Sequence, residues 1–248
     1  MPFFSVIIAT YNSQKTLKRA LDSIIEQTFT DFEIVIADGA SKDDTMSIIK
    51  SFDPKYFGII LSEKDSGIYD AWNKGVNVAR GEWICFLGSD DYFEKDAFKS
   101  YHNAITNSST KLNYVSSKVC LVTTAGRQIG IIGKPWHKKT FKKYMTVAHV
   151  GSMHHRSLYS ECGLYDTTYK SSGDYELLLR AGDNLKAGFL DKLTAFMEYG
   201  GTSAGLVGLK ETYKAKIVSG KVPKFKAFIE HLDACARLIV RRFIYERK

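Results

Sequence analysis

Several aspartates of this sequence lie directly after short apolar segments, where their carboxylates could act together. Asp38 follows "FEIVIA", Asp65 follows "GIILSEK", and Asp90 and Asp91 end "CFLGSDD". A single acid after a strand is as often a turn former or a helix N-cap, and that alternative stays open for each residue. The carboxyl ends of parallel strands meet at one edge of a sheet, so we expect these four acids and the segment "TYN" (10–12) to converge on one rim.

Asp90 and Asp91 are adjacent like charges, which is costly unless a cation or separate hydrogen-bond partners divide them. The pattern GxGxxG is missing after the first apolar segment, where "ATYNS" stands, and GxxxxGK[ST] does not occur. Neither a dinucleotide-binding fold nor a P-loop is therefore predicted. Without a glycine cradle, a divalent cation remains as the group that can hold a diphosphate beside carboxylates. We expect one acid to ligate the metal and the other to bind hydroxyls.

The elements that must position these residues alternate between strand and helix patterns over the first hundred residues. Strand-like segments are expected at 3–9, 32–37, 58–61 and 83–87. Helical patterns begin at Ser13 and at Ser41, where Asp44 three residues later indicates a capping box, and a further one covers 68–79. This order predicts an α/β fold with a mostly parallel central sheet and helices on both faces.

The rhythm changes after Phe93. Segments 114–123 and 128–132 flank "TTAGR" and predict an antiparallel hairpin, followed by a helix at 175–181 and a last strand near 189–196. This half is expected to be α+β and attached to the first sheet. Beyond "GGTSAG" (200–205) the chain becomes lysine-rich and then forms a helical apolar stripe. The stripe comprises Phe225, Phe228, Ile229, Leu232, Ala236, Ile239 and Phe243.

Composition and charge narrow the class of protein. With 44% hydrophobic residues, 248 residues can bury a sizeable core, which excludes a disordered or fibrous chain. Of the formal charge of +8, residues 201–248 contribute 11 Lys or Arg against 4 Asp or Glu, which suggests an anionic partner, nucleic acid or a phospholipid surface. No signal peptide or membrane span is apparent, so a cytoplasmic location is expected. Four cysteines without a CxxC pair are expected to be reduced thiols.

The sequence over residues 4–200 resembles the inverting family 2 glycosyltransferases with the GT-A fold, especially bacterial enzymes that build surface polysaccharides. Three stretches carry the resemblance. They are "SVIIATYNSQKTLKRALDSIIEQTFTDFEIVIADGASKDDT", "SEKDSGIYDAWNKGVNVARGEWICFLGSDDYF" and "SSGDYELLLR". The resemblance implies a nucleotide-sugar-binding half at 1–110, an acceptor-binding half with the catalytic base at 111–200, and a basic helical extension at 201–248.

The resemblance also implies roles for the rim. Thr10, Tyr11 and Asn12 would line the nucleotide pocket, and Asp38 would accept a hydrogen bond from N3–H of a uracil. The stretch "SDD" is similar to the family's DxD motif with Ser89 at its first position. In it Asp90 would face the ribose or donor sugar, and Asp91 would ligate Mn²⁺ or Mg²⁺ bridging the diphosphate.

The stretch "DSGIYDAWNKG" (65–75) is similar to the family's segment over the donor sugar. The implied contacts are Asp65, Gly67, Asp70, Asn73 and Lys74. Helix packing is the alternative for this stretch, for Asp70 and Lys74 in particular.

Asp174 in "GDYELLLR" is similar to the acid that serves as catalytic base in this family, where many relatives carry a glutamate at position 173. The alternative is a charge that only stabilises a helix N-terminus. His149 and His154 resemble a family segment near the acceptor, and we prefer this to an independent metal site. Trp136 lies in the lysine-rich segment 134–144, which is either a solvated loop or a contact to an acceptor phosphate or a lipid surface.

The resemblance therefore implies a metal-dependent, inverting transfer from a UDP-sugar to a hydroxyl of a glycan acceptor. The acceptor is expected to be linked to a polyprenyl diphosphate, with the enzyme in the cytoplasm at the inner face of the membrane. The basic terminal helix would either dock on the catalytic domain or lie in the membrane interface; no nucleic-acid motif accompanies its charge. Two other classes stay open: a non-catalytic nucleotide-sugar or glycan-binding module, and a nucleotidyltransferase, which the missing phosphate loop disfavours.

Overall fold

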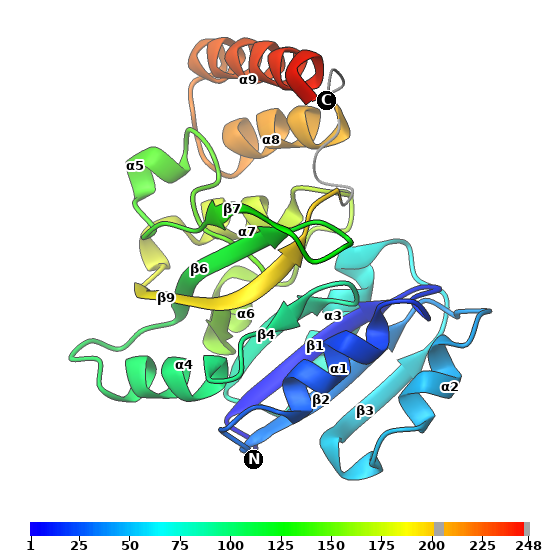
Figure 1. Ribbon diagram of the computed structural model, residues 1–248. Coiled ribbons are helices and arrows are strands. Elements are labelled where there is room, and N and C mark those ends of the chain that lie inside the picture. The colour runs from blue at the N-terminus through cyan, green and yellow to red at the C-terminus, as the bar shows by residue number, and fades with distance from the viewer. Residues whose placement is uncertain (201–205, 246–248) are drawn as a thin grey trace.

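The computed structural model describes residues 1–200 and 206–245, and one nine-stranded sheet runs through them (Figure 1). The strand order is β3-β2-β1-β4-β8-β6-β9-β5, with β7 paired to β6 beside this path. The strands are β1 (Phe4–Thr10), β2 (Phe32–Asp38), β3 (Phe57–Ser62), β4 (Trp83–Gly88), β5 (Tyr92–Phe93), β6 (Tyr114–Val122), β7 (Gln128–Ile132), β8 (Met153–His155) and β9 (Ala187–Glu198). The α-helices are α1 (Leu17–Ile25), α2 (Thr45–Lys50), α3 (Ile68–Val78), α4 (Ala97–Thr106), α5 (Lys138–Phe141), α6 (Ser157–Cys162), α7 (Gly173–Ala181), α8 (Leu206–Val218) and α9 (Lys224–Tyr245).

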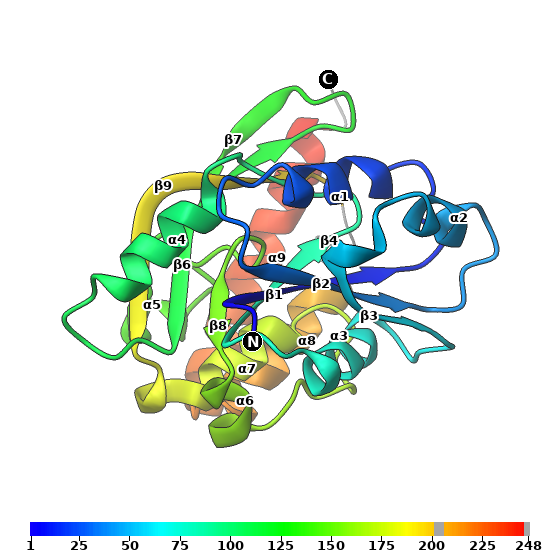
Figure 2. The ribbon, with the colours of Figure 1, turned by 90° about the horizontal axis from the view of Figure 1, so that it is seen from below.

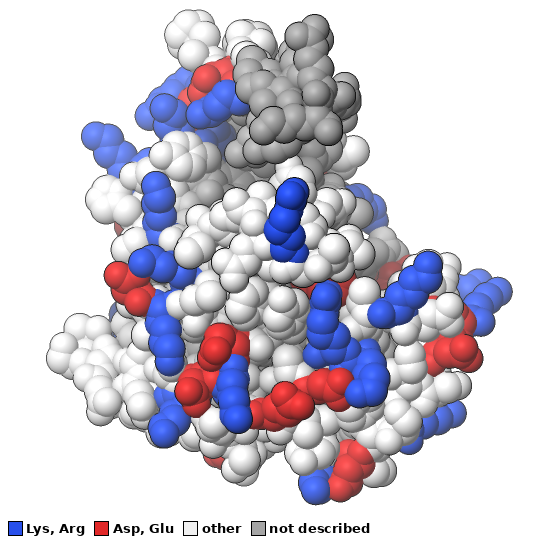
Figure 3. Space-filling view, in the orientation of Figure 1, with Lys and Arg blue, Asp and Glu red and all other residues white. Residues whose placement is uncertain are grey.

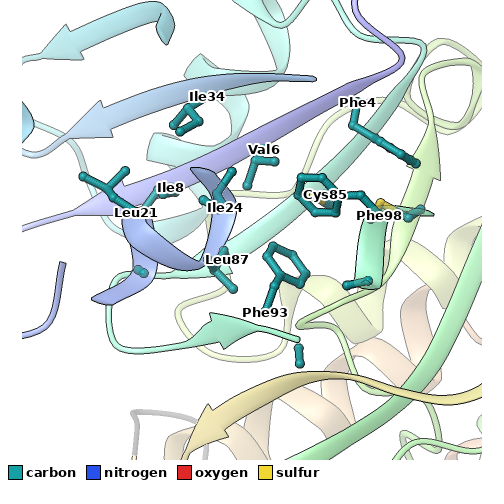
Figure 4. Packing of buried hydrophobic residues seen from close by; sticks show 14 of the residues in the cluster. Phe4, Val6, Ile8, Leu21, Ile24, Ile34, Cys85, Leu87, Phe93 and Phe98 are labelled. Carbon is teal, nitrogen blue, oxygen red and sulfur yellow. The ribbon is translucent and has the colours of Figure 1, made fainter. Parts of the chain in front are cut away.

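Helices cover both faces of the parallel part of the sheet, as the alternating pattern predicts. Residues of β1 point alternately to the two sides: Val6 and Ile8 pack with α1 and α4, whereas Ile7 packs with α3 and α7. Figure 2 shows α1 and α2 on one side of β1 and β2, and α3, α6 and α7 on the other. The first of these cores is built from hydrophobic side chains, with Phe93 and Phe98 close to Cys85 of β4 (Figure 4). The predicted α/β class is confirmed.

The second half adds antiparallel pairs to the sheet. The predicted hairpin is confirmed, because β6 and β7 pair antiparallel, with Val119 opposite Ile132. Strand β8 lies between β4 and β6 and is antiparallel to both. The short strand β5 follows Asp91 and pairs with the far end of β9, Tyr92 opposite Phe196. One continuous sheet therefore joins the two predicted halves.

The predicted capping box at Ser41 is wrong. Helix α2 begins at Thr45, and no side-chain hydrogen bond caps it at Asp44. The Ser41 hydroxyl instead donates to Asp38, and the Ser41 oxygen accepts the Asn12 N–H at 2.8 Å. A hydrogen bond to the buried carboxylate of Asp38, three residues earlier in the chain, has replaced the predicted cap.

Helices α8 and α9 form the C-terminal extension. Ala227 is fully buried, and Lys216 of α8 forms an ion pair of 2.9 Å with Glu230 of α9. The exposed fraction of Phe225 is 78%, and Phe228, Ile229 and Leu232 are each about half exposed. The alternative in which this part of the stripe docks on the catalytic domain is therefore wrong. The side chains of Ile239 and Phe243 lie outside those described.

The surface of the N-terminal half carries charges of both signs. In Figure 3 acidic and basic side chains mingle over the lower part of the face, where α1 lies. A shallow hollow lies beside α1, and the residues that line it include Lys15, Lys18, Asp22 and Glu26. Among the helices of 1–200 and 206–245, none has the length and apolar character that crossing a bilayer requires.

Candidate active site

The carboxyl ends of β1, β2 and β3 lie level and enclose Asp38. In the parallel register Asp38 pairs with Thr10 on one side and with Ser62 on the other. Its side chain is 2% exposed and accepts hydrogen bonds from the hydroxyls of Thr10 (2.9 Å) and Ser62 (2.7 Å). The hydroxyl and N–H of Ser41 donate to it as well. Burial alone would raise the pKa of Asp38, but these donors outweigh burial and lower the pKa, so Asp38 is held as a carboxylate.

The segment after β1 meets the segments after β2 and β3 at Gly39. A Cβ at Gly39 would lie 2.6 Å from Asp65 Oδ2 and 3.3 Å from the Tyr11 ring, so the glycine allows both to approach. Tyr11 is 66% exposed, and Asn12 has a positive φ of 50° and accepts the Lys42 N–H at 2.9 Å. The predicted convergence of these strand ends is confirmed.

Asp90 and Asp91 lie side by side over Gly88. A Cβ at Gly88 would be 2.8 Å from Asp90 Oδ1 and 2.6 Å from Asp91 Oδ2. Asp91 is 5% exposed, and its Oδ1 accepts the Glu198 N–H at 2.9 Å. Burial and then the charge of Asp90 raise the pKa of Asp91 to about 7, and burial also raises the pKa of Asp90. Two carboxylates with raised pKa values, close together, favour a cation between them.

Arg19 and Glu198 complete this cluster and were missed in the sequence. Arg19 Nη2 donates to the Asp90 carbonyl at 2.5 Å and to Glu198 Oε2 at 3.2 Å, and its guanidinium lies 4.7 Å from the centre of the Tyr92 ring. Arg19 thus contacts the backbone of the acidic pair, not its carboxylates. No local motif could have revealed these residues, since 179 positions separate Arg19 from Glu198.

The acidic pair fits a divalent cation when a phosphate ligand is also present. Within the described ranges, no three His, Cys, Asp or Glu side chains form a group that could hold a metal ion by themselves. Mg²⁺ bound with nucleotides commonly takes one or two carboxylates and completes its ligands with phosphate oxygens and water. Asp91, with Asp90 beside it, offers such a partial ligand set.

The predicted donor stretch 65–75 divides into two parts. Asp65 Oδ1 accepts the Gly67 N–H, and Asp70 Oδ2 accepts the Ser66 N–H, each at 2.9 Å, which shapes the turn before α3. Asn73 uses both ends of its amide on the backbone of Tyr165, at 2.8 and 2.9 Å. The ammonium of Lys74 bonds to Glu63 at 3.0 Å and to the Lys64 carbonyl at 2.8 Å. These contacts engage the side-chain polar atoms of Asn73 and Lys74 within the protein, and a role of either residue in donor binding stays a prediction.

Asp174 lies in the first turn of α7, next to Tyr69 of α3. Its Oδ1 accepts the Tyr175 N–H at 2.9 Å and the Tyr69 hydroxyl at 3.2 Å. For Oδ2 the described part of the chain provides no hydrogen-bond donor. Gly173 packs against the Tyr69 ring so closely that a Cβ there would be 2.8 Å from ring carbons, so a larger residue at 173 would require the ring to move. One carboxylate oxygen is fixed and the other is left for a ligand.

His149 and His154 belong to a buried network beneath Tyr165. His149 is 9% exposed, stacks on Trp72 at 4.7 Å and lies 3.1 Å from the Tyr165 hydroxyl. His154 is fully buried, with its ring nitrogens at the hydroxyls of Tyr159 (2.9 Å) and Ser152 (3.2 Å). Burial lowers the pKa of both imidazoles, which favours their neutral forms. His154 therefore has a supporting position without direct access to an acceptor.

Trp136 is half-buried at the edge of the second core, 6.3 Å from Phe141 between ring centres. It lines a shallow hollow together with His137, Lys138, Lys139 and Lys142. Lys138 pairs with Asp183, so part of this basic segment is neutralised. The hollow therefore combines the Trp136 ring with basic side chains.

Comparison with protein families identifies the chain. The family described as "Glycosyl transferase family 2" matches residues 5–160. The "PGL/p-HBAD biosynthesis glycosyltransferase" of Mycobacterium tuberculosis is 33% identical over 212 residues, which cover 83% of this chain and 81% of that protein. The "Poly(ribitol-phosphate) beta-glucosyltransferase" of Bacillus spizizenii is 28% identical over 144 residues, 56% of this chain and 21% of that protein.

Solved structures agree on the fold. TarS of S. aureus (residues 1–349, in complex with UDP-GlcNAc) superposes with a TM-score of 0.70 at 22% identity and covers 98% of this chain and 73% of that one. The mannosyltransferase PcManGT of Pyrobaculum calidifontis, in complex with GDP-Man and Mn²⁺, gives a TM-score of 0.62 at 19% identity, over 96% and 70% of the two chains.

Proposed function

The chain belongs to glycosyltransferase family 2, and on that premise we propose that it transfers a sugar from a UDP-sugar to a hydroxyl of a glycan acceptor, with inversion, in bacterial surface polysaccharide synthesis. Two sites together carry this proposal. One is the strand-end rim with Asp38 and the acidic pair Asp90–Asp91, and the other is the carboxylate of Asp174, whose Oδ2 accepts no hydrogen bond from the described residues. A donor site and a base are the two requirements of such a transfer.

The nucleotide is proposed to bind at the ends of β1 and β2. Tyr11 presents an exposed ring on which a base can stack. Asp38 has a lowered pKa, which suits an acceptor for the uracil N3–H. Because four donors already reach the Asp38 carboxylate, a uracil would have to replace one of them, and the hydroxyl of the exposed Ser62 is the one that can turn away. Thr10 and Asn12 would complete this pocket, with Asp65, Gly67 and Asp70 nearer the sugar.

The diphosphate is proposed to lie at the acidic pair. Asp91 would hold Mn²⁺ or Mg²⁺, which when bound supplies positive charge to the departing diphosphate. Asp90 and Ser89 would face the ribose or sugar. Arg19 fixes the backbone of this turn through the Asp90 carbonyl.

Asp174 is proposed as the general base. Its free Oδ2 would take the proton of the acceptor hydroxyl while that oxygen bonds to the anomeric carbon and the bond to the diphosphate breaks on the opposite side. Tyr69 and the Tyr175 N–H hold Oδ1 and so keep Oδ2 oriented. His149 and Trp136 would lie on the acceptor side.

The acceptor is proposed to be linked to a polyprenyl diphosphate, with the enzyme in the cytoplasm at the inner face of the membrane. The exposed residues Phe225, Phe228, Ile229 and Leu232 recur on one face of α9, and Lys224 and Lys226 flank them. An apolar stripe with basic neighbours is typical of a helix in an anionic membrane interface. We expect the protein to sediment with anionic vesicles but not with neutral ones. The double variant Phe225→Ser, Phe228→Ser should no longer sediment with either.

The central test compares the wild type with Asp174→Asn. When Mn²⁺ and an extract that contains acceptors are present, we expect the wild type to release UDP from at least one of the UDP-sugars tested. It should release no GDP from GDP-mannose. Asp174→Asn should lose at least about 100-fold in kcat and keep its affinity for UDP. Unchanged turnover in Asp174→Asn would refute the base. Binding without turnover in both proteins would indicate a nucleotide-sugar-binding module, and pyrophosphate release from UTP a nucleotidyltransferase.

A further inference from the structure

Helix α8 holds the loop that leads into Asp174. The carboxylate of Glu211 accepts hydrogen bonds from the backbone N–H groups of Lys170 (2.7 Å), Ser171 (2.8 Å) and Ser172 (3.0 Å). Consecutive N–H groups that point to one side form a concave site for an anion, and a carboxylate with two oxygens can satisfy all three of them.

The same loop has further contacts to α8. The Ser172 hydroxyl donates to the Gly208 carbonyl at 3.2 Å and lies 3.3 Å from the Thr212 hydroxyl. Helix α8 is itself anchored, because Ala215 is fully buried and the Ser219 hydroxyl donates to Glu176 of α7 at 2.6 Å. Figures 1 and 2 show α8 beside α7 in both views. The loop is thus fastened to a helix that is fixed in the fold.

The loop connects the predicted base with the predicted donor stretch. Asp174 follows Ser172 by two residues, at the start of α7. On the other side, the Lys170 ammonium donates to the Ser66 carbonyl at 2.6 Å, and a Cβ at Gly67 would be 3.7 Å from this ammonium. Movement of the loop would therefore displace the base and the turn before α3 together.

We infer that Glu211 is a positioning residue for the transfer, and that α8 of the C-terminal extension is part of the catalytic structure. Glu211 acts through the backbone of residues 170–172 and does not itself touch the reacting groups. This inference rests on the proposed role of Asp174. It requires a carboxylate, because a glutamine side chain would offer one acceptor oxygen and turn an NH₂ group toward N–H donors.

The test is Glu211→Gln, with Glu230→Gln as the matched control. Glu230 lies in α9 and its contact is the ion pair with Lys216, so its variant weakens the docking of α8 and α9 without touching the loop. In Glu211→Gln we expect kcat to fall at least about tenfold, since small misplacements of a catalytic group are costly, while the dissociation constant of UDP changes by less than about threefold. Amide hydrogen exchange should become faster in peptides that contain residues 170–172. In Glu230→Gln, kcat and exchange of these peptides should stay near the wild type.

Two outcomes would overturn the inference. The first is unchanged exchange of the 170–172 amides in Glu211→Gln. The second is an equal fall of kcat in both variants at an equal loss of thermal stability, which would show a general effect of destabilisation. If the wild type transfers no sugar at all, the proposed function fails. Hydrogen exchange then still decides whether Glu211 holds the loop: faster exchange confined to these peptides supports it, and unchanged exchange refutes it.

Discussion

Asp91→Asn should stabilise the metal-free protein at neutral and alkaline pH, although it should abolish metal-dependent transfer. The Asp91 carboxylate is 5% exposed, and burial together with the charge of Asp90 raises its pKa from 3.8 to about 7. The folded protein therefore binds more protons than the unfolded chain between these values, so the free energy of unfolding falls as pH rises through this window. A shift of this size corresponds to about 4 kcal/mol above pH 7.

Asparagine removes this penalty and keeps the contact, because its amide oxygen can still accept the Glu198 N–H. Urea denaturation in chelator, followed by circular dichroism, should show Asp91→Asn to be more stable than the wild type by up to about 4 kcal/mol at about pH 8, and by roughly 1–2 kcal/mol at about pH 5. With UDP already present, addition of Mn²⁺ should stabilise the wild type further and leave the variant unchanged. Equal stabilities at pH 8 in chelator would refute the argument from burial, and equal stabilisation by metal would refute Asp91 as its ligand.

Three further substitutions follow from the contacts of α7 and α8. Tyr69→Phe removes the hydroxyl that orients Asp174, so kcat should fall about tenfold with UDP affinity retained, and an equal fall in UDP affinity would speak against an orienting role. Gly173→Ala places a Cβ 2.8 Å from the Tyr69 ring, so the free energy of unfolding in urea should fall by about 1–3 kcal/mol. An unchanged urea midpoint of unfolding would contradict this expectation. Lys216→Met leaves the Glu230 carboxylate buried without its partner, since the two side chains are only 5% and 10% exposed in the native pair. The free energy of unfolding, measured by thermal denaturation, should fall by about 3 kcal/mol, and a fall of less than about 1 kcal/mol would show that the pair is dispensable.

The parallel part of the fold and its rim could be predicted from the sequence because their signals are local. Each strand of β1 to β4 is a short apolar run, and parallel strands end at one edge of a sheet, so the sequence alone predicts that Asp38, Asp65 and Asp90 lie on one side. Ser41 shows where a motif can mislead, because its hydroxyl bonds to the carboxylate of Asp38, three residues before it, and does not cap α2.

The rest of the site depends on contacts between residues that lie far apart in the sequence, so no local pattern could predict them. Strands β5 and β8 have two and three residues, too few for a periodic pattern, and they are defined by the long strands beside them. Glu211 lies about 40 residues after the backbone groups that it binds. The apolar stripe of α9 correctly predicted a helix, but amphipathic spacing does not identify the surface that covers it.

The contact between Asp91 and Glu198 has a consequence for synthesis of the chain. These residues are 107 positions apart, and β5, next to Asp91, pairs with the end of β9. Strands β1 to β4 can associate as soon as they leave the ribosome, whereas contacts of such long sequence separation form late. We therefore expect the nucleotide side of the rim to be shaped early and the acidic turn to remain unfixed until residue 198 has emerged. A nascent chain is accordingly expected to hold a metal-bound donor only after residue 198 has emerged.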